Sequence, residues 1–170
     1  KDIAHILNNL ASAPLGISED IDFRISIAGA QEKTALLYWK DNWHIPQGTT
    51  ATTHILKPSM GTVQNGIDIS ESVENEYFCM TLLSALGIPA AKTEIVDFAG
   101  KKALAVERFD RQWTKDGRLL RLPQEDMCQA MSIPPDTKYE SDGGAGMKRI
   151  LELLKGSDTP QEDQKTFLQA

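Results

Sequence analysis

The chain has 170 residues, of which 41% are hydrophobic and 25% are charged. This composition excludes collagen-like, low-complexity and wholly disordered chains, and the length suits one ordinary domain or two small lobes that share a cleft. Acidic residues number 24 and basic residues 18, and the net charge of −6 argues against non-specific nucleic-acid binding by the whole chain.

The hydrophobic pattern predicts a short helix, three strands, a longer helix and two further strands, followed by a mainly helical segment. Strands are predicted where short apolar runs occur or apolar and polar residues alternate, at residues 23–27, 34–39, 54–57, 92–98 and 103–106. Helices are predicted where apolar residues recur three and four apart, at residues 3–12, 70–86, 122–131 and 147–155. We expect the first two strands to form a hairpin with its tip near Gly29, and the polar tail from Gly156 to be frayed.

The turn of this predicted hairpin is a candidate for phosphate binding. Ala28, Gly29 and Ala30 have small side chains, so their backbone N–H groups could approach a polyphosphate closely. Most such turns are only turns, and this alternative stays open. The following pair, Lys33 and Thr34, resembles the end of a P-loop but lacks the glycines of that motif and the helix that follows them.

Lys57 and Glu76 are the second candidate. Lys57 ends an apolar strand, where a lysine is either an exposed strand terminus or a phosphate-binding ammonium like that of the third kinase strand. Glu76 lies on or beside the apolar stripe of the predicted helix, where an unpaired charge would be costly. We therefore predict an ion pair between Lys57 and Glu76, with Glu74 as the competing partner on a different helix face.

The charged string that leaves the last predicted strand is the third candidate. Glu107, Arg108, Phe109 and Asp110 stand where a kinase-like chain crosses from its small lobe to its large lobe. At that place backbone groups would hydrogen-bond adenine, and an apolar side chain would pack beside it. The alternative is a solvated loop with an incidental aromatic residue. The three candidates occur in the order that a kinase small lobe requires.

Membrane insertion and metal or redox chemistry are not indicated by the sequence. No run approaches the ~20 apolar residues that a membrane span requires, and the first residues lack the apolar stretch of a signal peptide. Cys79 and Cys128 are isolated, and the three histidines lack metal-ligand spacing. We therefore expect reduced thiols, a cytoplasmic location, no membrane association and no zinc or redox centre. Because the chain begins with Lys1 rather than Met, we also expect a segment of a longer polypeptide.

Residues 24–37, with the sequence RISIAGAQEKTALL, resemble the glycine-rich-loop region of HipA-type serine/threonine kinase toxins, which belong to bacterial toxin–antitoxin pairs. Further strings extend the resemblance over nearly the whole chain, at residues 53–57, 75–77, 103–111, 122–129 and 138–144. The resemblance implies a kinase-like α+β fold. Residues 1–110 would form an N-lobe with an antiparallel sheet and one packed helix, and residues 111–170 would form the mostly helical start of a C-lobe.

The resemblance also implies roles for the candidate residues. Lys57 would bind the phosphates of ATP, with Glu76 as its supporting partner. Ser26 would be the serine whose autophosphorylation displaces the loop and switches the kinase off. The phosphate loop would comprise Ala28, Gly29, Ala30, Gln31, Glu32 and Lys33. The adenine would be held at the hinge by Glu107, Arg108 and Phe109.

The strings that carry catalysis in this family do not occur in the chain. HipA-type kinases need an aspartate that orients the substrate hydroxyl and a further aspartate for Mg²⁺. The nearest candidate, Asp142, is followed by the wrong residues. We therefore predict no catalytic residue and no metal ligand in this chain, and no phosphate transfer by the chain alone, although the parent protein would use ATP and Mg²⁺.

For the parent protein, the resemblance implies a kinase toxin that phosphorylates a translation factor such as glutamyl-tRNA synthetase and causes growth arrest and persistence. Its partners would be a HipB-like helix-turn-helix antitoxin and, through that complex, operator DNA. Two alternatives stay open. One is a pseudokinase-like binding module that keeps the ATP fold without catalysis, and the other is a small-molecule kinase on the same scaffold.

Basic residues are concentrated between Lys101 and Arg121. Residues 101–121 hold seven basic and three acidic residues, a difference of +4 that contrasts with −6 for the whole chain. We predict a basic face that steers an acidic protein partner or the DNA complex of the antitoxin. A solvated hairpin with scattered charge is the alternative. The basic residues are Lys101, Lys102, Arg108, Arg111, Lys115, Arg118 and Arg121.

Overall fold

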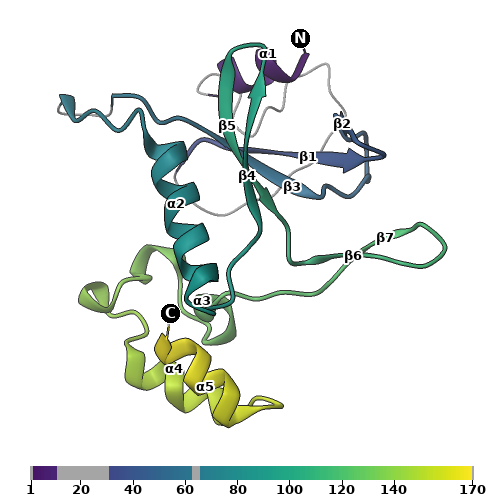
Figure 1. Ribbon diagram of the computed structural model, residues 1–170. Helices are drawn as coiled ribbons and strands as arrows, with labels where there is room; N and C mark the ends of the chain where they lie inside the picture. Colours follow the sequence, from purple (N-terminus) through teal and green to yellow (C-terminus); the bar gives the residue numbers. More distant parts are fainter. Residues whose placement is uncertain (1, 11–30, 63–65, 170) are drawn as a thin grey trace. The chain divides into compact units, whose positions relative to one another are not determined.

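A computed structural model describes residues 2–10, 31–62 and 66–169 of the chain (Figure 1). The predicted strand at residues 23–27 lies outside these residues, as does the predicted hairpin tip with Ser26, Ala28, Gly29 and Ala30. The chain divides into two compact units, Lys1–Leu122 and Pro123–Ala170, which are described separately. None of the helices among the described residues is long and apolar enough to cross a membrane.

The first unit is built on a five-stranded antiparallel sheet with the strand order β2-β1-β3-β5-β4. Its strands are β1 (Thr34–Trp39), β2 (Asn42–His44), β3 (His54–Pro58), β4 (Thr93–Phe98) and β5 (Lys101–Glu107). The strands predicted within the described residues are confirmed. The short strand β2 was not predicted. It follows a two-residue turn in which Lys40 and Asp41 have φ angles of 49° and 59°, the backbone that such a turn needs but a residue pair that seldom signals it.

One face of this sheet carries the core. Helix α1 (Asp2–Asn8) covers it, and the buried residues come from the helix end and from β1, β3 and β5. They are Ile6, Leu7, Leu10, Leu36, Leu56, Ala103 and Ala105. Leu56 is paired with Ala105 across β3 and β5, so both side chains point to the same side. We call this side the α1 face.

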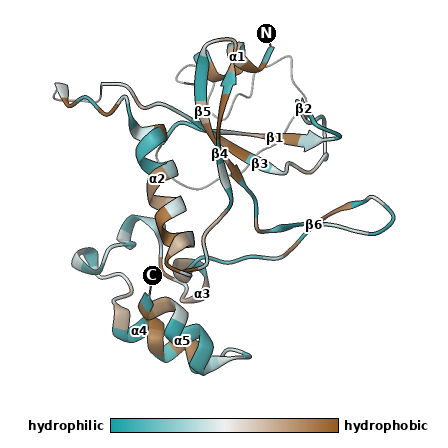
Figure 2. Ribbon diagram, in the orientation of Figure 1, coloured by the Kyte–Doolittle hydropathy of each residue, from teal (hydrophilic) through white to brown (hydrophobic). Residues whose placement is uncertain are grey.

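The opposite side of the sheet meets helix α2 (Ser72–Ala85), and we call it the α2 face. Alternation along β3 places Lys57 on this side, one residue after the core residue Leu56. The helix packs beside β4 and β5 (Figure 1), and Val73 is its buried residue. Figure 2 shows polar residues in the first turns of α2 and apolar residues toward its carboxyl end. The predicted helix at 70–86 is confirmed, and Gly87, with φ of 75°, ends it.

A second, two-stranded sheet follows β5 in the first unit. It consists of β6 (Arg111–Trp113) and β7 (Leu119–Arg121), which form a hairpin. The bounds of this hairpin were not predicted, although Asp116 and Gly117 at its turn are a typical hairpin signal. The lobes predicted from the sequence, residues 1–110 and 111–170, remain a prediction.

The second unit is helical and irregular, as predicted in outline. Its elements are α3 (Met127–Ala130), two 3-10 turns (Pro135–Thr137 and Glu140–Asp142), α4 (Met147–Leu154) and α5 (Pro160–Gln169). The predicted start of a helix at Leu122 is wrong, because Asp126 accepts a hydrogen bond from the backbone N–H of Gln129 and caps the helix there. The prediction of a frayed tail from Gly156 is also wrong, since α5 occupies most of it.

Candidate functional site

Lys57 and Glu76 form the predicted ion pair. Lys57 Nζ on β3 lies 2.5 Å from Glu76 Oε1 on α2. The two side chains are 24% and 31% exposed, so the pair lies at the edge of the packed region where a ligand can reach it. The pairing itself is confirmed. Its role in holding ATP phosphates stays a prediction.

The competing carboxylate, Glu74, has its own partner. It accepts a hydrogen bond from Lys102 on β5, and the pair is exposed. This bond is the main reason why the pKa of Glu74 lies below its ordinary value and that of Lys102 lies above. Helix α2 therefore makes two lysine–glutamate pairs on one side of the sheet, and only one of them involves Lys57.

Of the predicted phosphate loop, the structure describes Gln31, Glu32 and Lys33. Lys33 is buried and directly precedes β1. Burial, with a contribution from the charge of Lys57, lowers the pKa of Lys33. Thr34 is paired with Leu56 across β1 and β3, so the segment that ends the predicted loop lies beside Lys57.

The predicted hinge residues differ in whether their backbone N–H groups already donate hydrogen bonds. The backbone N–H of Glu107 donates to Lys92 O, and that of Arg108 donates to Thr53 O, both at 2.9 Å. The backbone N–H of Phe109 makes no hydrogen bond within the described part of the chain. The Phe109 side chain is 76% exposed. Phe109 is therefore the hinge residue that presents both a free donor and an apolar ring.

The Glu107 side chain points away from Lys57. Glu107 is paired with His54 and, by strand alternation, lies on the α1 face. It lines a cavity of about 430 Å³ on that side, together with His54 and Glu94. An ion pair of 3.5 Å connects it to the exposed Lys92. Any contribution of Glu107 at the hinge comes from its backbone.

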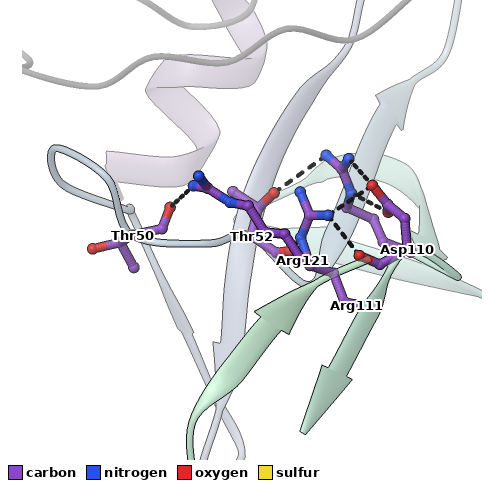
Figure 3. Close-up of polar contacts among 6 residues, drawn as sticks. Thr50, Thr52, Asp110, Arg111 and Arg121 are labelled. Carbon is purple, nitrogen blue, oxygen red and sulfur yellow. Dashed lines mark hydrogen bonds and ion pairs between the residues drawn. The ribbon is translucent and has the colours of Figure 1, made fainter. Parts of the chain in front are cut away.

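Sequence reasoning missed a buried cluster around Asp110, which Figure 3 shows. Arg108 donates to both carboxylate oxygens of Asp110 at 2.9 and 2.8 Å, and Arg111 donates to one of them at 2.6 Å. Arg108 also reaches Thr52 Oγ1 at 3.4 Å, and Arg111 reaches Thr52 O at 2.9 Å. We call Arg108, Asp110, Arg111 and Thr52 the Asp110 cluster. Its charged side chains are no more than 9% exposed.

Charge pairing sets the titration of this cluster. The hydrogen bond from Arg108 lowers the pKa of Asp110 despite burial, and Arg111 adds to the effect. The pKa of Arg111 is itself lowered, chiefly by burial. Asp110 is therefore ionised at neutral pH and holds two guanidinium groups.

The prediction of a basic face is wrong. Four of the seven basic residues are paired with carboxylates, at three separate places on the first unit. Lys102 pairs with Glu74, Arg118 pairs with Asp116, and two arginines share the buried Asp110. Arg121 donates to Thr49 O at 2.8 Å. The alternative, a hairpin with scattered charge, describes this region, because the basic side chains are held at separate places.

Among the described residues, no group of three or more histidine, cysteine, aspartate or glutamate side chains is arranged to hold a metal ion. Cys79 and Cys128 are free thiols.

Residues 25–170 match the family model for the HipA-like C-terminal domain. Over 169 residues the chain is 39% identical to "Putative kinase Y4mE" of Sinorhizobium fredii, and the match covers 99% of this chain and 39% of that protein. Over 134 residues it is 37% identical to the serine/threonine-protein kinase toxin HipA of Shewanella oneidensis, covering 78% of this chain and 29% of the relative. The chain thus spans about two fifths or less of these relatives.

A solved structure is also similar to the chain. It is a chain from the complex of HipA, HipB and operator DNA of the Shewanella oneidensis MR-1 toxin–antitoxin system. The TM-score is 0.72 and the sequence identity 29%, and the match covers 99% of this chain and 41% of that chain. The predicted kinase-like α+β fold is confirmed by this match and by the five-stranded sheet with its packed helix.

Proposed function

This chain belongs to the HipA-like C-terminal domain family, and from that premise we propose that the protein containing it is an ATP-dependent serine/threonine protein kinase toxin. The chain would supply the nucleotide-binding lobe and the start of the second lobe. The observation that carries the proposal is the Lys57–Glu76 ion pair between β3 and α2. A lysine of the third kinase strand is oriented by a helix glutamate in the same way when it holds nucleotide phosphates.

The phosphates of ATP would bind at the Lys57 end of the site. Lys57 carries a positive charge at the exposed edge of the α2 face, and Lys33 lies close enough for the two charges to interact. A polyphosphate would relieve that repulsion, because each ammonium gains an anionic neighbour. In this proposal the loop from Ala28 to Lys33 covers the phosphates with its backbone N–H groups.

The adenine would bind at the hinge formed by Glu107, Arg108 and Phe109. The N–H of Phe109 makes no hydrogen bond among the described residues and is available to an acceptor, and the exposed ring of the same residue offers an apolar surface. Adenine N1 is an acceptor, whereas the N1 of guanine carries a hydrogen and would face the donor unfavourably. Glu107 and Arg108 would contribute by fixing the strand end through their bonds to Lys92 and Thr53.

Mg²⁺ and the catalytic carboxylates are not assigned to this chain. Among its described residues no group of three or more histidine, cysteine, aspartate or glutamate side chains is arranged to hold a metal ion, and we derive no step through Mg²⁺ here. The chain would bind and orient the nucleotide, and it would not transfer phosphate alone.

For the complete protein we propose the partners that its relatives suggest. The similar solved structure is a complex with HipB and operator DNA, which supports a HipB-like antitoxin and operator DNA as partners. We further propose a protein substrate resembling glutamyl-tRNA synthetase, with growth arrest and persistence as the outcome. Autophosphorylation of Ser26 would inhibit the kinase, because the added negative charge would compete with the phosphates of ATP.

The test compares two lysines that pair with the same helix. In the full-length protein, Lys57→Ala should abolish toxicity and phosphate transfer, because the phosphates lose their ammonium partner. Lys102→Ala, which removes the pair with Glu74, should leave both intact and is the matched control. Growth arrest and transfer by the Lys57→Ala protein would overturn the proposal.

A further inference from the structure

Phe109 stands between two firmly anchored neighbours. On one side, the backbone N–H of Arg108 is bound to Thr53 O. On the other side, the backbone carbonyl of Asp110 accepts from the N–H of Leu122 at 2.9 Å and from Arg111 Nη1 at 2.8 Å. Phe109 itself has an exposed ring, and its N–H has no acceptor in the part of the chain that the structure describes. Its orientation is therefore set by the residues beside it.

The Asp110 carboxylate connects these two anchors. It holds Arg108, which precedes Phe109, and Arg111, which follows it, and both guanidinium groups reach Thr52 just before β3 (Figure 3). A buried ion cluster contributes little net stability compared with apolar packing. In this protein its hydrogen bonds connect Arg108 and Arg111 with Asp110 and with Thr52. The cluster thus fixes the turn at residues 108–111 against the strand that carries Lys57.

We propose that Asp110 is a positioning residue for base recognition, which aims the Phe109 N–H at the acceptor nitrogen of the adenine ring. The inference rests on the proposed function, because it assumes that nucleotide binds at this hinge. Asp110 does not touch the nucleotide. It acts through Arg108 and Arg111, which hold the backbone on both sides of the donor.

A purely structural role for Asp110 makes a different prediction. If the cluster only attaches the β6–β7 hairpin to the sheet, its loss should change stability without changing which atoms of the base are recognised. The positioning role instead couples Asp110 to one atom of the ligand, adenine N1. Such coupling is measured by changing the residue and the ligand atom separately and together.

The experiment uses the full-length protein, its isosteric variant Asp110→Asn, and two ligands, ATP and 1-deaza-ATP, in which a C–H replaces N1. The wild-type protein should bind ATP about tenfold more tightly than 1-deaza-ATP, the ratio for one well-placed hydrogen bond. In Asp110→Asn this ratio should fall to about twofold or less, while affinity for tripolyphosphate should stay within about twofold of wild type. Asp116→Asn, at the exposed pair with Arg118, is the control and should retain the full ratio.

The other results are equally informative. An unchanged ATP to 1-deaza-ATP ratio in Asp110→Asn would overturn the positioning role while leaving the proposed function in place. Equal losses of ATP, 1-deaza-ATP and tripolyphosphate affinity would assign Asp110 a structural role only. If the wild-type protein binds neither ATP nor tripolyphosphate, the proposed function fails and the positioning role fails with it. A urea unfolding curve establishes that the variant is folded, and if it is not, Arg111→Lys, which keeps the charge and loses the forked geometry, takes its place.

Discussion

Two of the ion-pair systems in the first unit use the same chemistry in different surroundings. The Lys57–Glu76 pair joins a strand to a helix through one contact, and both side chains are partly exposed. The Asp110 cluster joins neighbouring residues through three charged contacts, and its side chains are almost fully buried. Lys57 can exchange Glu76 for a ligand. The Asp110 cluster cannot exchange its partners without leaving a buried charge unpaired.

This difference separates binding from positioning. A partly exposed pair contributes little to stability, so a lysine in it remains available to an incoming phosphate. Two buried guanidinium groups that lose their carboxylate, or lose its negative charge, carry a large desolvation penalty. We therefore expect substitutions at Lys57 to affect ligand binding and substitutions at Asp110 to affect both stability and geometry.

The largest expected effect on stability is that of Asp110→Ala. It leaves two buried guanidinium groups without their carboxylate, and the free energy of unfolding should fall by about 3 kcal/mol or more. Lys57→Ala removes a partly exposed pair and should change the free energy of unfolding by less than about 1 kcal/mol. Urea unfolding of the full-length variants measures both. A loss at Lys57 as large as that at Asp110 would contradict the contrast between the two systems.

The stability difference between wild type and Asp110→Asn should depend on pH. The folded-state pKa of Asp110 lies below its unfolded value, so its stabilising charge is fully present above the unfolded pKa and is lost as pH falls through the folded pKa. At neutral pH the variant should be less stable by about 2 kcal/mol, since it loses charged hydrogen bonds. The unfolding free energies of the wild type and of Asp110→Asn should begin to converge as pH falls below about 4, the unfolded pKa, and should meet once pH has passed the lower folded pKa. A gap that stays constant over this range would show that the carboxylate charge is not what stabilises the cluster.

A smaller effect is expected from the helix partner of Lys57. Glu76→Gln keeps the shape of the side chain but removes the charge that orients the lysine, and kcat/KM for ATP should fall about tenfold, or ~1.4 kcal/mol. The matched control is Glu74→Gln, which removes the equivalent charge from the pair with Lys102. Equal losses from the two variants would indicate a general effect on α2 rather than a role for Glu76.

Much of the Lys57 system could be predicted from the sequence, and almost none of the Asp110 cluster. The helix period places Glu76 beside apolar residues, where a charge requires a partner. The strand that ends in Lys57 before this helix, as in a kinase small lobe, identified the partner. Arg108, Asp110 and Arg111 are adjacent in the sequence and resemble a solvated charged loop. Their burial depends on Thr52, more than fifty residues earlier, which only the β3–β5 pairing brings beside them.

Helix boundaries and hairpins instead depend on local signals, some of which compete with one another. The helix at α2 was predicted because its apolar spacing and its glycine stop are both local. The start of α3 was misplaced because proline at position 123 favoured an earlier start, whereas the reciprocal bonds of Asp126 and Gln129 determine it. The β6–β7 hairpin could have been predicted from Asp116-Gly117, but the charged residues around that turn masked the signal.

The smallest expected effect concerns His54 on the α1 face. This half-buried imidazole packs against Tyr38 and Trp43, and burial lowers its pKa, while the charges of Glu107 and Glu94 act in the opposite direction. Between the unfolded pKa, about 6.5, and the lower folded one, the unfolded chain binds more protons, so stability should fall as pH decreases from about 6.5.

Two substitutions with opposite signs test this. His54→Gln should reduce the fall in unfolding free energy between pH 7 and pH 5, and the reduction should be less than about 1 kcal/mol. Glu94→Gln should steepen it, because the imidazolium loses a neighbouring carboxylate that helps it to form. Unfolding free energies at the two pH values measure both. If the two variants shift the pH dependence in the same direction, the balance between burial and carboxylate charge at His54 is not the cause, and the α1 face contributes to acid sensitivity only through its packing.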